Sequence, residues 1–334
     1  MTFPLPLPIA DPELAAALSA RLDLVEERLR DAVTHADLLA DSASRHLVNA
    51  GGKRLRSLLT LLTAQLGEGQ RPEVIDAAVV VELTHLATLY HDDVMDSAPM
   101  RRGAPTAHEV WGNSVAILTG DLLFARASRV VSGLGPEAVR IQAETFERLC
   151  LGQLHETVGP GAGDNAIEHY LQVLADKTGS LIATAARFGA MFAGCEPPVV
   201  AQVTSYGELA GVAFQLADDV IDVRSAAEVT GKTPGTDLRE RVATMPVLLL
   251  RERVAAGGGA EDRALLAAID GDLTSDVRLA EVVAALGRHS VVDETSEKAR
   301  SWGDEAIAAI AGLPVGEVKD ALVAFADALV SRAG

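Results

Sequence analysis

The chain has 334 residues and a formal net charge of −18, and 49% of its residues are hydrophobic. The negative charge excludes nucleic acid as a partner, because a phosphate backbone is bound through a basic surface. The hydrophobic content is ample for a large core. Long stretches rich in Ala, Leu and Val, with few alternating runs, predict an all-α fold.

The ends and the cysteines of the chain bear on its location. Cys150 and Cys195 give no disulfide framework, which predicts a reducing, cytoplasmic compartment. We find no signal-peptide pattern at the N-terminus, and no charge-free apolar run of about 18 residues that predicts a transmembrane segment. Residues 1–10 hold three prolines and are expected to form an extended arm, with residues 11–334 as a single domain.

Apolar periodicity predicts helices separated by breaks rich in Gly and Pro. The first starts near Asp11, and the second is capped by Asp41 or Ser42 and stops at Gly51-Gly52. Further helices are expected at residues 54–67, 72–96, 108–133, 136–158, 164–194 and 197–224, with shorter ones from 244 to 332. Loops are expected at residues 97–103 and 230–240.

Two acidic clusters stand inside these apolar stretches. Residues 92–96 and 218–222 both read DDxxD. On a helix the first and last Asp of each motif share one face, a single turn apart. Carboxylates that converge in an apolar site repel one another and raise each other's pKa, which a hard divalent cation relieves. The clusters therefore predict a Mg²⁺ site that takes a charged, Mg²⁺-binding substrate.

Basic segments accompany the clusters. Gly51-Gly52-Lys53-Arg54-Leu55-Arg56 ends one expected helix and begins another, and its glycines permit close backbone approach. Lys53 and Arg56 are expected to share a helical face, which suits an anion such as diphosphate at a helix N-terminus. The commoner reading of such a segment is a solvated basic turn.

Arg101-Arg102-Gly103 follows the first DDxxD motif after a short loop. Its two guanidinium groups and the carboxylates complement each other around one polyphosphate. The alternative is a surface acidic turn with a compensating basic loop. The strongly apolar run from Val79 to Leu89 disfavours this alternative.

Further motifs follow along the chain. They are Lys177-Thr178, Phe214-Gln215 before the second DDxxD motif, and Lys232 after it. The whole series, from about residue 48 to 246, resembles the trans-isoprenyl diphosphate synthases, the polyprenyl synthetase family. The resemblance implies one large helical bundle of the isoprenoid synthase type, in which the two acidic motifs face each other across a deep central cavity.

The resemblance also implies the reaction, a trans (1′–4) head-to-tail condensation of isopentenyl diphosphate with an allylic diphosphate. Mg²⁺, about three ions per site with substrate bound, would be held by Asp92, Asp93, Asp96, Asp218, Asp219 and Asp222. The allylic diphosphate would be bound by Arg101, Lys177, Thr178, Gln215 and Lys232, of which Lys177 and Lys232 join the six Asp as catalytic residues. Isopentenyl diphosphate would be bound by Lys53, Arg56, Arg102 and His85. Without the resemblance, His85 reads as a core histidine.

Two positions depart from the family pattern. The family usually has Pro where this chain has Ser57. Relatives commonly carry a diphosphate-binding Lys where this chain has Val242, and Arg241 is the neighbouring cation. This departure puts one contact in doubt and leaves the reaction intact.

The family sets product length by the bulk of residues below the first DDxxD motif. Ala87 and Thr88 are small, and Leu83 and Thr84 stand one turn further. A helical turn rises about 5.4 Å, close to one extended isoprene unit. We therefore expect a product of about C30 or longer, which Ala87→Phe should shorten. Phe124 on an opposing helix is an alternative floor.

Other functions remain as alternatives. They are a shorter-chain (geranylgeranyl or farnesyl) diphosphate synthase, a class I terpene cyclase, and a catalytically silent regulatory subunit. The second DDxxD motif disfavours the cyclase, and the presence of all six Asp disfavours the silent subunit. The family mostly forms homodimers, so we expect a homodimer, and release of a long product is expected to involve a membrane.

Overall fold

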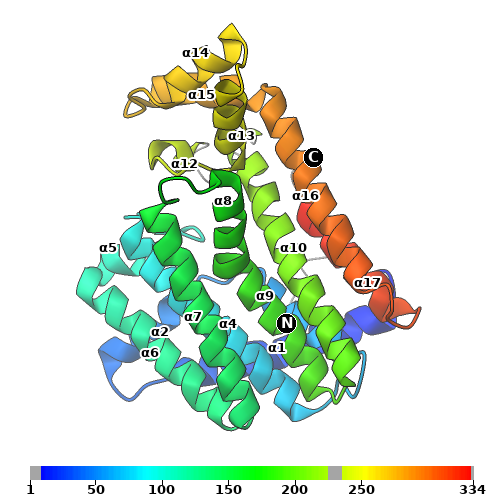
Figure 1. Cartoon of the computed structure of the whole chain (residues 1–334). Coiled ribbons are helices and arrows are strands. Elements are labelled where there is room, and N and C mark those ends of the chain that lie inside the picture. Colours follow the sequence, from blue (N-terminus) through cyan, green and yellow to red (C-terminus); the bar gives the residue numbers. More distant parts are fainter. Residues whose placement is uncertain (1–8, 225–234, 332–334) are drawn as a thin grey trace. The chain divides into compact units, whose positions relative to one another are not determined.

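The computed structural model describes residues 9–224 and 235–331. Helices make up most of this part of the chain, which confirms the all-α prediction (Figure 1). The helices up to the first long loop are α1 (Pro12–Val33), α2 (Leu38–Asn49), α3 (Leu55–Ala64) and α4 (Pro72–Met95). The next elements are β1 (Met100–Arg101), β2 (Ala104–Pro105), α5 (Ala107–Trp111), α6 (Asn113–Ser132), α7 (Pro136–Val158), α8 (Ala166–Leu174), η1 (Ala175–Gly179), α9 (Ser180–Phe192) and α10 (Pro197–Arg224). The last are α12 (Thr236–Arg239), α13 (Met245–Ala255), α14 (Ala260–Ile269), α15 (Asp276–Gly287), α16 (Ser290–Ala309) and α17 (Glu317–Ser331).

Most helix boundaries agree with the sequence prediction, but the predicted start of the second helix was wrong. Asp37 caps α2, and its side chain accepts a hydrogen bond from the Ala40 N–H at 2.9 Å. Asp41 lies inside the helix, where its carboxylate accepts from the His35 N–H at 2.9 Å. Any Asp near a helix start can supply this acceptor, so the pattern alone did not decide which one does.

Two expected long helices are interrupted. Gly112, with φ 84°, separates α5 from α6 inside the segment predicted as one helix. A single turn of π-helix, η1, separates α8 from α9 and contains Lys177 and Thr178. A π turn carries one extra residue and is frequent at functional sites. The interruption therefore falls on a pair of residues that the sequence had singled out.

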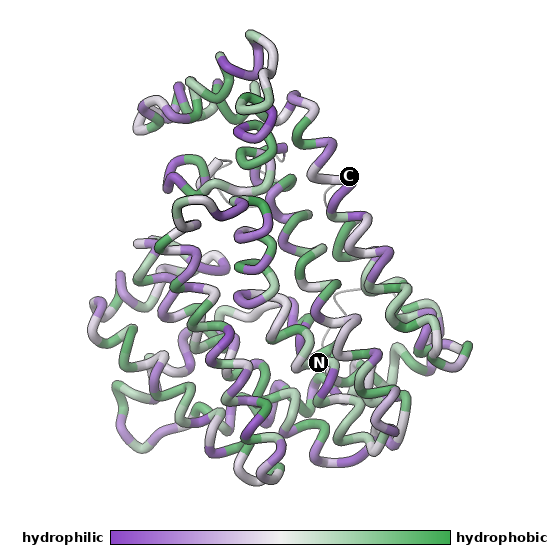
Figure 2. The backbone as a smooth tube through the Cα atoms, viewed as in Figure 1, coloured by the Kyte–Doolittle hydropathy of each residue, from purple (hydrophilic) through white to green (hydrophobic). Residues whose placement is uncertain are grey.

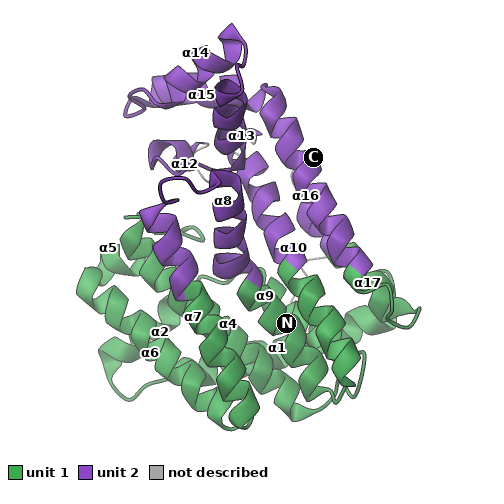
Figure 3. Ribbon diagram, in the orientation of Figure 1, with its two compact units in different colours: residues 1–149, 180–208, 309–325 green, residues 150–179, 209–308, 326–334 purple. Residues whose placement is uncertain are grey.

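The described chain divides into two compact units (Figure 3). Unit 1 comprises residues 1–149, 180–208 and 309–325, and unit 2 comprises residues 150–179, 209–308 and 326–334. Helices α7, α10 and α17 each contribute residues to both units. The expectation of a single domain stays a prediction, and the expected N-terminal arm lies almost entirely in residues 1–8, outside the described part.

The core of unit 1 is built around α4, which packs against α1, α3, α6 and α9. Its side chains are buried on several faces, including Val80, Leu83 and Ala87. Among the described helices, α4 is long and apolar enough to cross a membrane by length and composition. However, 67% of its most apolar window is buried inside the protein, and a core helix passes the same test.

Unit 2 has its own apolar core. Side chains of α8, α10, α13, α15 and α16 form one buried cluster that includes Leu216, Val220, Leu249 and Leu286. Figure 2 shows hydrophilic and hydrophobic positions alternating within the turns of many helices, as expected where one face packs inward.

Candidate active site

The first acidic motif lies in unit 1 at the C-terminal end of α4. Asp92 and Asp93 belong to its last turn, and Asp96 is its C-cap residue. Asp92 is partly buried, Asp93 is buried and Asp96 is exposed. The carbonyl groups at a helix C-terminus carry partial negative charge, so carboxylates there are unfavourable until a cation binds. This end of α4 is therefore suited to a metal ion.

The buried Asp93 carboxylate is held by Arg101. Its Oδ1 atom accepts a hydrogen bond from Nε of Arg101 at 2.7 Å, and Nη2 of Arg101 lies 2.6 Å from the same oxygen in an ion pair. Its buried Oδ2 atom has no hydrogen-bond partner among the described residues. Burial raises the pKa of Asp93, and the charge of Arg101 opposes that rise. Asp93 thus fixes Arg101 beside the motif and keeps one acceptor that a cation would satisfy.

The loop predicted after this motif is a small hairpin. Strands β1 and β2 pair antiparallel, with Arg101 opposite Ala104. Arg102 and Gly103 form the two-residue turn, with φ of 55° and 77°. Positive φ at both positions is the signature of a type I′ turn, which favours Gly at the second position. The turn therefore fixes the directions in which Arg101 and Arg102 leave the backbone.

Arg102 reaches from this hairpin to the end of α2. Its Nη1 atom donates to the Leu47 carbonyl at 3.3 Å and also to the Gly51 carbonyl. A Cβ atom at Gly52 would lie 2.7 Å from the Arg102 Cζ atom, too close for any side chain. The group that approaches the Gly51-Gly52 pair in this structure is the Arg102 guanidinium, and the predicted approach of a diphosphate stays a prediction.

The prediction that Lys53 and Arg56 share a helical face was wrong. Helix α3 begins at Leu55, and the residue before it, Arg54, has a left-handed backbone with φ 51°. Lys53 is exposed and precedes the helix, whereas Arg56 is partly buried in the first turn. The positive φ at Arg54 ends the regular geometry that the spacing had assumed.

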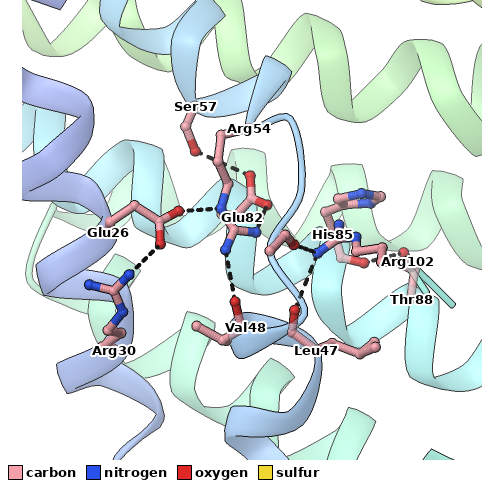
Figure 4. Close-up of polar contacts among 11 residues, drawn as sticks. Glu26, Arg30, Leu47, Val48, Arg54, Ser57, Glu82, His85, Thr88 and Arg102 are labelled. Atoms are coloured by element: carbon pink, nitrogen blue, oxygen red, sulfur yellow. Dashed lines mark hydrogen bonds and ion pairs between the residues drawn. The ribbon is translucent and has the colours of Figure 1, made fainter. Parts of the chain in front are cut away.

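His85 lies beside a group of arginines. Burial lowers the pKa of His85 well below its ordinary value of 6.5, and the charges of Arg56, Arg102, Arg54 and Arg101 lower it further. Figure 4 shows His85 next to Arg102. The side chain is therefore neutral near pH 7 and retains one N–H donor and one acceptor. The structure thus brings together three of the four side chains that the resemblance assigns to isopentenyl diphosphate.

Arg56 has an unused donor. Its buried Nε atom has no hydrogen-bond partner among the described residues. Burial lowers the pKa of Arg56, the charge of Glu82 opposes this, and the neighbouring charge of Arg102 adds to it. The neighbouring guanidinium groups of Arg56 and Arg102 favour the binding of an anion between or beside them.

The four residues expected to set product length differ in burial. Ala87 and Leu83 are fully buried, and Thr84 is 2% exposed. Thr84 accepts a hydrogen bond from Nε2 of Gln142 on α7 at 3.0 Å. Thr88 keeps an exposed fraction, and its hydroxyl donates to the His85 carbonyl at 2.8 Å. Thr88 is therefore the member of this set that has accessible surface.

The alternative floor residue, Phe124 on α6, belongs to an aromatic cluster. Its ring centroid lies 4.0 Å from that of Phe146 on α7 and 6.0 Å from that of His91 on α4. Both phenylalanines are partly buried. The cluster connects three helices of unit 1, among them the helix that bears the first acidic motif.

The second acidic motif lies in unit 2, near the C-terminal end of α10. Asp218 and Asp222 are partly buried, and Asp219 is buried. Asp219 accepts hydrogen bonds from the Tyr170 hydroxyl at 3.0 and 2.9 Å and from the Met245 N–H at 3.1 Å. Burial raises the pKa of Asp219 well above its ordinary range, and these two donors oppose that rise. The middle Asp is thus held by the protein in both motifs.

Lys177 and Thr178 both lie in the π turn η1. Nζ of Lys177 lies 2.5 Å from Oε2 of Glu156 on α7, and Thr178 is buried. A Cβ atom at Gly152 would lie 2.7 Å from the Lys177 backbone nitrogen, so α7 and η1 touch at this glycine. A lysine paired with a carboxylate in this way can exchange the carboxylate for a phosphate oxygen.

The remaining predicted residues are placed as follows. Gln215 lies on α10, one turn before Asp219, and is partly buried. Lys232 lies outside the described residues. Arg241 donates to the carbonyl groups of Asp270 and Gly271 at 3.1 and 2.7 Å. Arg241 therefore binds the end of α14, and the structure gives it no part in replacing the lysine that relatives carry.

Sequence reasoning missed several residues around the two acidic motifs. Tyr170 and Glu156 hold Asp219 and Lys177, respectively. The charge of Asp237 raises the pKa of Asp219, so a further carboxylate belongs to this region. Glu82 lies beneath the arginine group. An acidic or aromatic residue at a helical position gives no signal of its own, because its partner is far away in sequence.

The donors fit Mg²⁺ as a shared ligand of protein and substrate. Among the described residues, no three His, Cys, Asp or Glu side chains converge closely enough to hold a metal ion by themselves. Mg²⁺ commonly binds through one or two carboxylates, several waters and the phosphates of a substrate. The accessible Asp92 and Asp96, with the orphaned Oδ2 of Asp93, match that arrangement better than a closed protein cage.

Comparison with known proteins places the chain in a class. The structure matches that of the geranylgeranyl pyrophosphate synthase from Corynebacterium glutamicum, complexed with calcium and isoprenyl diphosphate. The TM-score is 0.84 at 42% identity, over 98% of this chain and 100% of the other. The fold is thus the all-α isoprenoid synthase fold, and the protein is a prenyltransferase.

The sequence narrows this class to a family. The model of the polyprenyl synthetase family matches residues 38–286. The nonaprenyl diphosphate synthase of Mycobacterium tuberculosis is 43% identical over 98% of this chain and 96% of its own length. Component 2 of the heptaprenyl diphosphate synthase of Geobacillus stearothermophilus is 35% identical over 91% of this chain and 93% of its own length. The chain belongs to the polyprenyl synthetase family, as the motifs had indicated.

Proposed function

We propose that this protein is a Mg²⁺-dependent trans-prenyltransferase that condenses isopentenyl diphosphate with an allylic diphosphate to give a polyprenyl diphosphate of about C30 or longer. The observation that carries the proposal is the group formed by Arg56, His85 and Arg102 in unit 1. These side chains are partly buried, and the first acidic motif lies in the same unit. Two guanidinium groups beside a neutral imidazole suit a diphosphate that is bound without metal.

In this proposal isopentenyl diphosphate binds to Arg56, His85 and Arg102, with Lys53 at the exposed rim. The unused Nε donor of Arg56 and the two guanidinium groups meet phosphate oxygens, and the neutral imidazole of His85 donates a further hydrogen bond. His85 in its neutral form adds no charge to an already cationic site. Binding of the anion also relieves the repulsion between Arg56 and Arg102.

The allylic diphosphate is proposed to bind through Arg101, Lys177, Thr178, Gln215 and Lys232, together with the two DDxxD motifs. Bound Mg²⁺ would supply Lewis-acid stabilisation of the charge on the departing diphosphate. Asp92, Asp96, Asp218 and Asp222 are the proposed direct ligands. Asp93 and Asp219 orient them, since both are buried and hydrogen bonded within the protein.

The chain's own residues supply the electrostatic part of the catalysis. Departure of diphosphate leaves an allylic carbocation, and the cationic side chains of Arg101 and Lys177 stabilise the negative charge that gathers on the leaving oxygens. Apolar walls exclude the water that would quench the cation. The C=C bond of isopentenyl diphosphate attacks the cation and a proton is lost. The side chains suggest no general base, so the departed diphosphate is proposed as the acceptor.

The product length rests on two kinds of support. The small residues Ala87 and Thr88, and the name of the nonaprenyl synthase relative at 43% identity, favour a long product. The alternative is a shorter, geranylgeranyl-type product, favoured by the solved structure at 42% identity. Since these identities are nearly equal, the relatives do not separate the two lengths.

We also propose a homodimer in the cytoplasm. Helix α6 carries exposed apolar side chains, with Leu118 65% and Ile117 42% exposed, which a second copy would cover. The alternative is a heteromer, suggested by the relative named as component 2 of its enzyme. Light scattering of the purified protein separates a homodimer from a monomer that awaits another subunit.

One experiment tests the proposed function. The pure protein is incubated with Mg²⁺, labelled isopentenyl diphosphate and farnesyl diphosphate, and the dephosphorylated products are separated by chain length. We expect successive elongation to about C30 or beyond. A C20 product would support the shorter-chain alternative, a cyclised hydrocarbon would indicate a cyclase, and no turnover would indicate a subunit that needs a partner.

A further inference from the structure

A buried ion network lies beneath the proposed isopentenyl diphosphate site. Arg54 donates from Nη1 to Oε1 of Glu82 at 2.8 Å and from Nε to Oε1 of Glu26. The side chains of Arg54 and Glu82 are 1% and 2% exposed. Figure 4 shows the three side chains meeting from the start of α3, from α4 and from α1. Such a charge is stable when buried only because its partners are in place.

Each of the three side-chain nitrogen atoms of Arg54 donates a hydrogen bond. Its Nη2 atom donates to the Val48 carbonyl at 3.3 Å, at the end of α2. The adjacent carbonyl, that of Leu47, accepts from Arg102. Two arginines thus donate to two neighbouring carbonyl groups in the last turn of α2, and the Val48 carbonyl also accepts from the Gly51 N–H at 3.2 Å. The Arg54 side chain is 1% exposed, so it is turned away from solvent although it stands between Lys53 and Arg56 in the sequence.

Glu82 has a second partner in Ser57. Its Oε2 atom accepts a hydrogen bond from the hydroxyl of Ser57 at 3.1 Å. Ser57 stands where the sequence pattern of the family usually has Pro, and a Pro has no hydroxyl to donate. The departure noted in the sequence therefore adds a contact to the network.

We infer that Glu82 and Arg54 are positioning residues for the isopentenyl diphosphate site. They hold the segment from Val48 to Arg54 between three helices and thereby aim Arg56 and Arg102 at the substrate. The inference rests on the proposed function of that site. It assigns Arg54 a role different from that of its basic neighbours, because its guanidinium is occupied by two buried carboxylates.

The left-handed backbone of Arg54 shows why such an anchor is needed. A residue with a side chain at φ 51° is unfavourable and persists only where its surroundings fix it. The ion pairs with Glu26 and Glu82 supply that fixation. Without them the segment would relax, and the Arg56 and Arg102 guanidinium groups would shift relative to each other.

The test compares Glu82→Gln with Glu73→Gln, an exposed acid on the same helix. We expect Glu82→Gln to raise the KM for isopentenyl diphosphate about ten-fold, while the KM for the allylic diphosphate stays within about two-fold. Calorimetry with isopentenyl diphosphate in the absence of Mg²⁺ should show the same loss of affinity. Glu73→Gln should change neither quantity. An equal rise of both KM values, or no rise in either, would overturn the inference.

A milder variant covers the case in which Glu82→Gln does not fold. Ser57→Ala removes one hydrogen bond and leaves all charges in place, so its fold should persist. We expect it to raise the KM for isopentenyl diphosphate about two- to five-fold, with the thermal midpoint nearly unchanged. An unchanged KM would contradict the inference. If the wild-type protein elongates no substrate at all, the proposed function fails instead, so the two failures are distinct.

Discussion

The Tyr170 hydroxyl lies within 3.0 Å of both carboxylate oxygens of Asp219. Tyr170 is on α8 and Asp219 is the middle residue of the second DDxxD motif on α10, so the contact joins two helices of unit 2. The backbone N–H of Met245 completes the set of donors. Tyr170 and Met245 therefore fix the orientation of the Asp219 carboxylate.

Tyr170→Phe should weaken the binding of Mg²⁺ without removing a proposed metal ligand. The buried Asp219 would lose one of its donors and reorient, and Asp218 would move with it. Loss of a residue that orients a metal ligand typically costs about 10- to 100-fold in metal affinity or activity. The concentration of Mg²⁺ that gives half-maximal rate should rise about ten-fold at saturating substrates.

Tyr206→Phe is the matched control for this substitution. Tyr206 is also buried, and its hydroxyl donates to the Leu322 carbonyl at 2.6 Å in unit 1. Both variants should lose about 1–2 kcal/mol of unfolding free energy. Only Tyr170→Phe should change the dependence of the rate on Mg²⁺, and an equal change in both variants would assign Tyr170 a merely structural role.

Metal and diphosphate should stabilise the fold together. Carboxylates at the C-terminal ends of α4 and α10 oppose the helix dipoles, and a cation relieves that cost. Because no closed metal site exists among the described residues, Mg²⁺ alone should have a small effect. Mg²⁺ with inorganic diphosphate should raise the thermal midpoint by roughly 5 °C or more when both are well above their dissociation constants.

Chelation and a single substitution check the origin of this shift. Excess EDTA should abolish both the joint shift and prenyl transfer. Asp92→Asn should remove most of the shift, whereas Glu73→Gln on the same helix should leave it intact. A full shift with diphosphate in the presence of EDTA would show that the basic residues alone carry the effect.

Much of the fold could be predicted because the local signals were strong. The start of α1 at Pro12, the start of α4 at Pro72 and the whole of α7 followed from Pro, Asp and apolar periodicity. The break at Gly112 and the π turn at Ala175–Gly179 could not be predicted in this way. The π turn packs closely against α7, where a Cβ atom at Gly152 would lie 2.7 Å from the Lys177 backbone nitrogen. At Gly112 the break is a backbone conformation with φ 84°, which glycine adopts readily.

The chemistry of the site was predictable in kind but incomplete in its contacts. Motif order identified the acidic and basic residues, and the two glycines before Lys53 indicated a close approach. The sequence did not show that Arg54 is occupied by Glu26 and Glu82, since these partners are 28 residues away on either side. It also assumed a helix at Lys53, where the backbone of the next residue is left-handed.

The pH dependence of stability should contain a contribution from His85. Its pKa lies well below the ordinary value of 6.5 in the folded protein, because of burial and the surrounding arginines. The unfolded state therefore takes up a proton at a higher pH than the folded state does. The contribution of His85 to the free energy of unfolding is fully present above about pH 6.5 and is lost as the pH falls below that value.

Urea unfolding at several pH values between about 5 and 8 measures this contribution. His85→Gln should flatten the decrease below about pH 6.5. The exposed His155→Gln serves as the control and should leave the profile as it is in the wild type. Identical profiles for wild type and His85→Gln would show that other groups cause the acid sensitivity.

Product length should respond to Thr88 more cleanly than to Ala87. Ala87 is fully buried, so a Phe there must displace its neighbours at a cost of about 1–3 kcal/mol in unfolding free energy. Thr88 is one position on and partly exposed, so Thr88→Phe can project its ring into accessible space. We expect Thr88→Phe to shorten the main product by at least one isoprene unit while its thermal midpoint stays near that of the wild type. Ala87→Phe should show both a shorter product and a lower midpoint.

Thr88→Ser, which keeps the hydroxyl that donates to the His85 carbonyl, is the matched control and should give the wild-type product. An unchanged product distribution in Thr88→Phe would mean that the floor lies elsewhere, and Phe124 on α6 would be the next residue to replace by Ala.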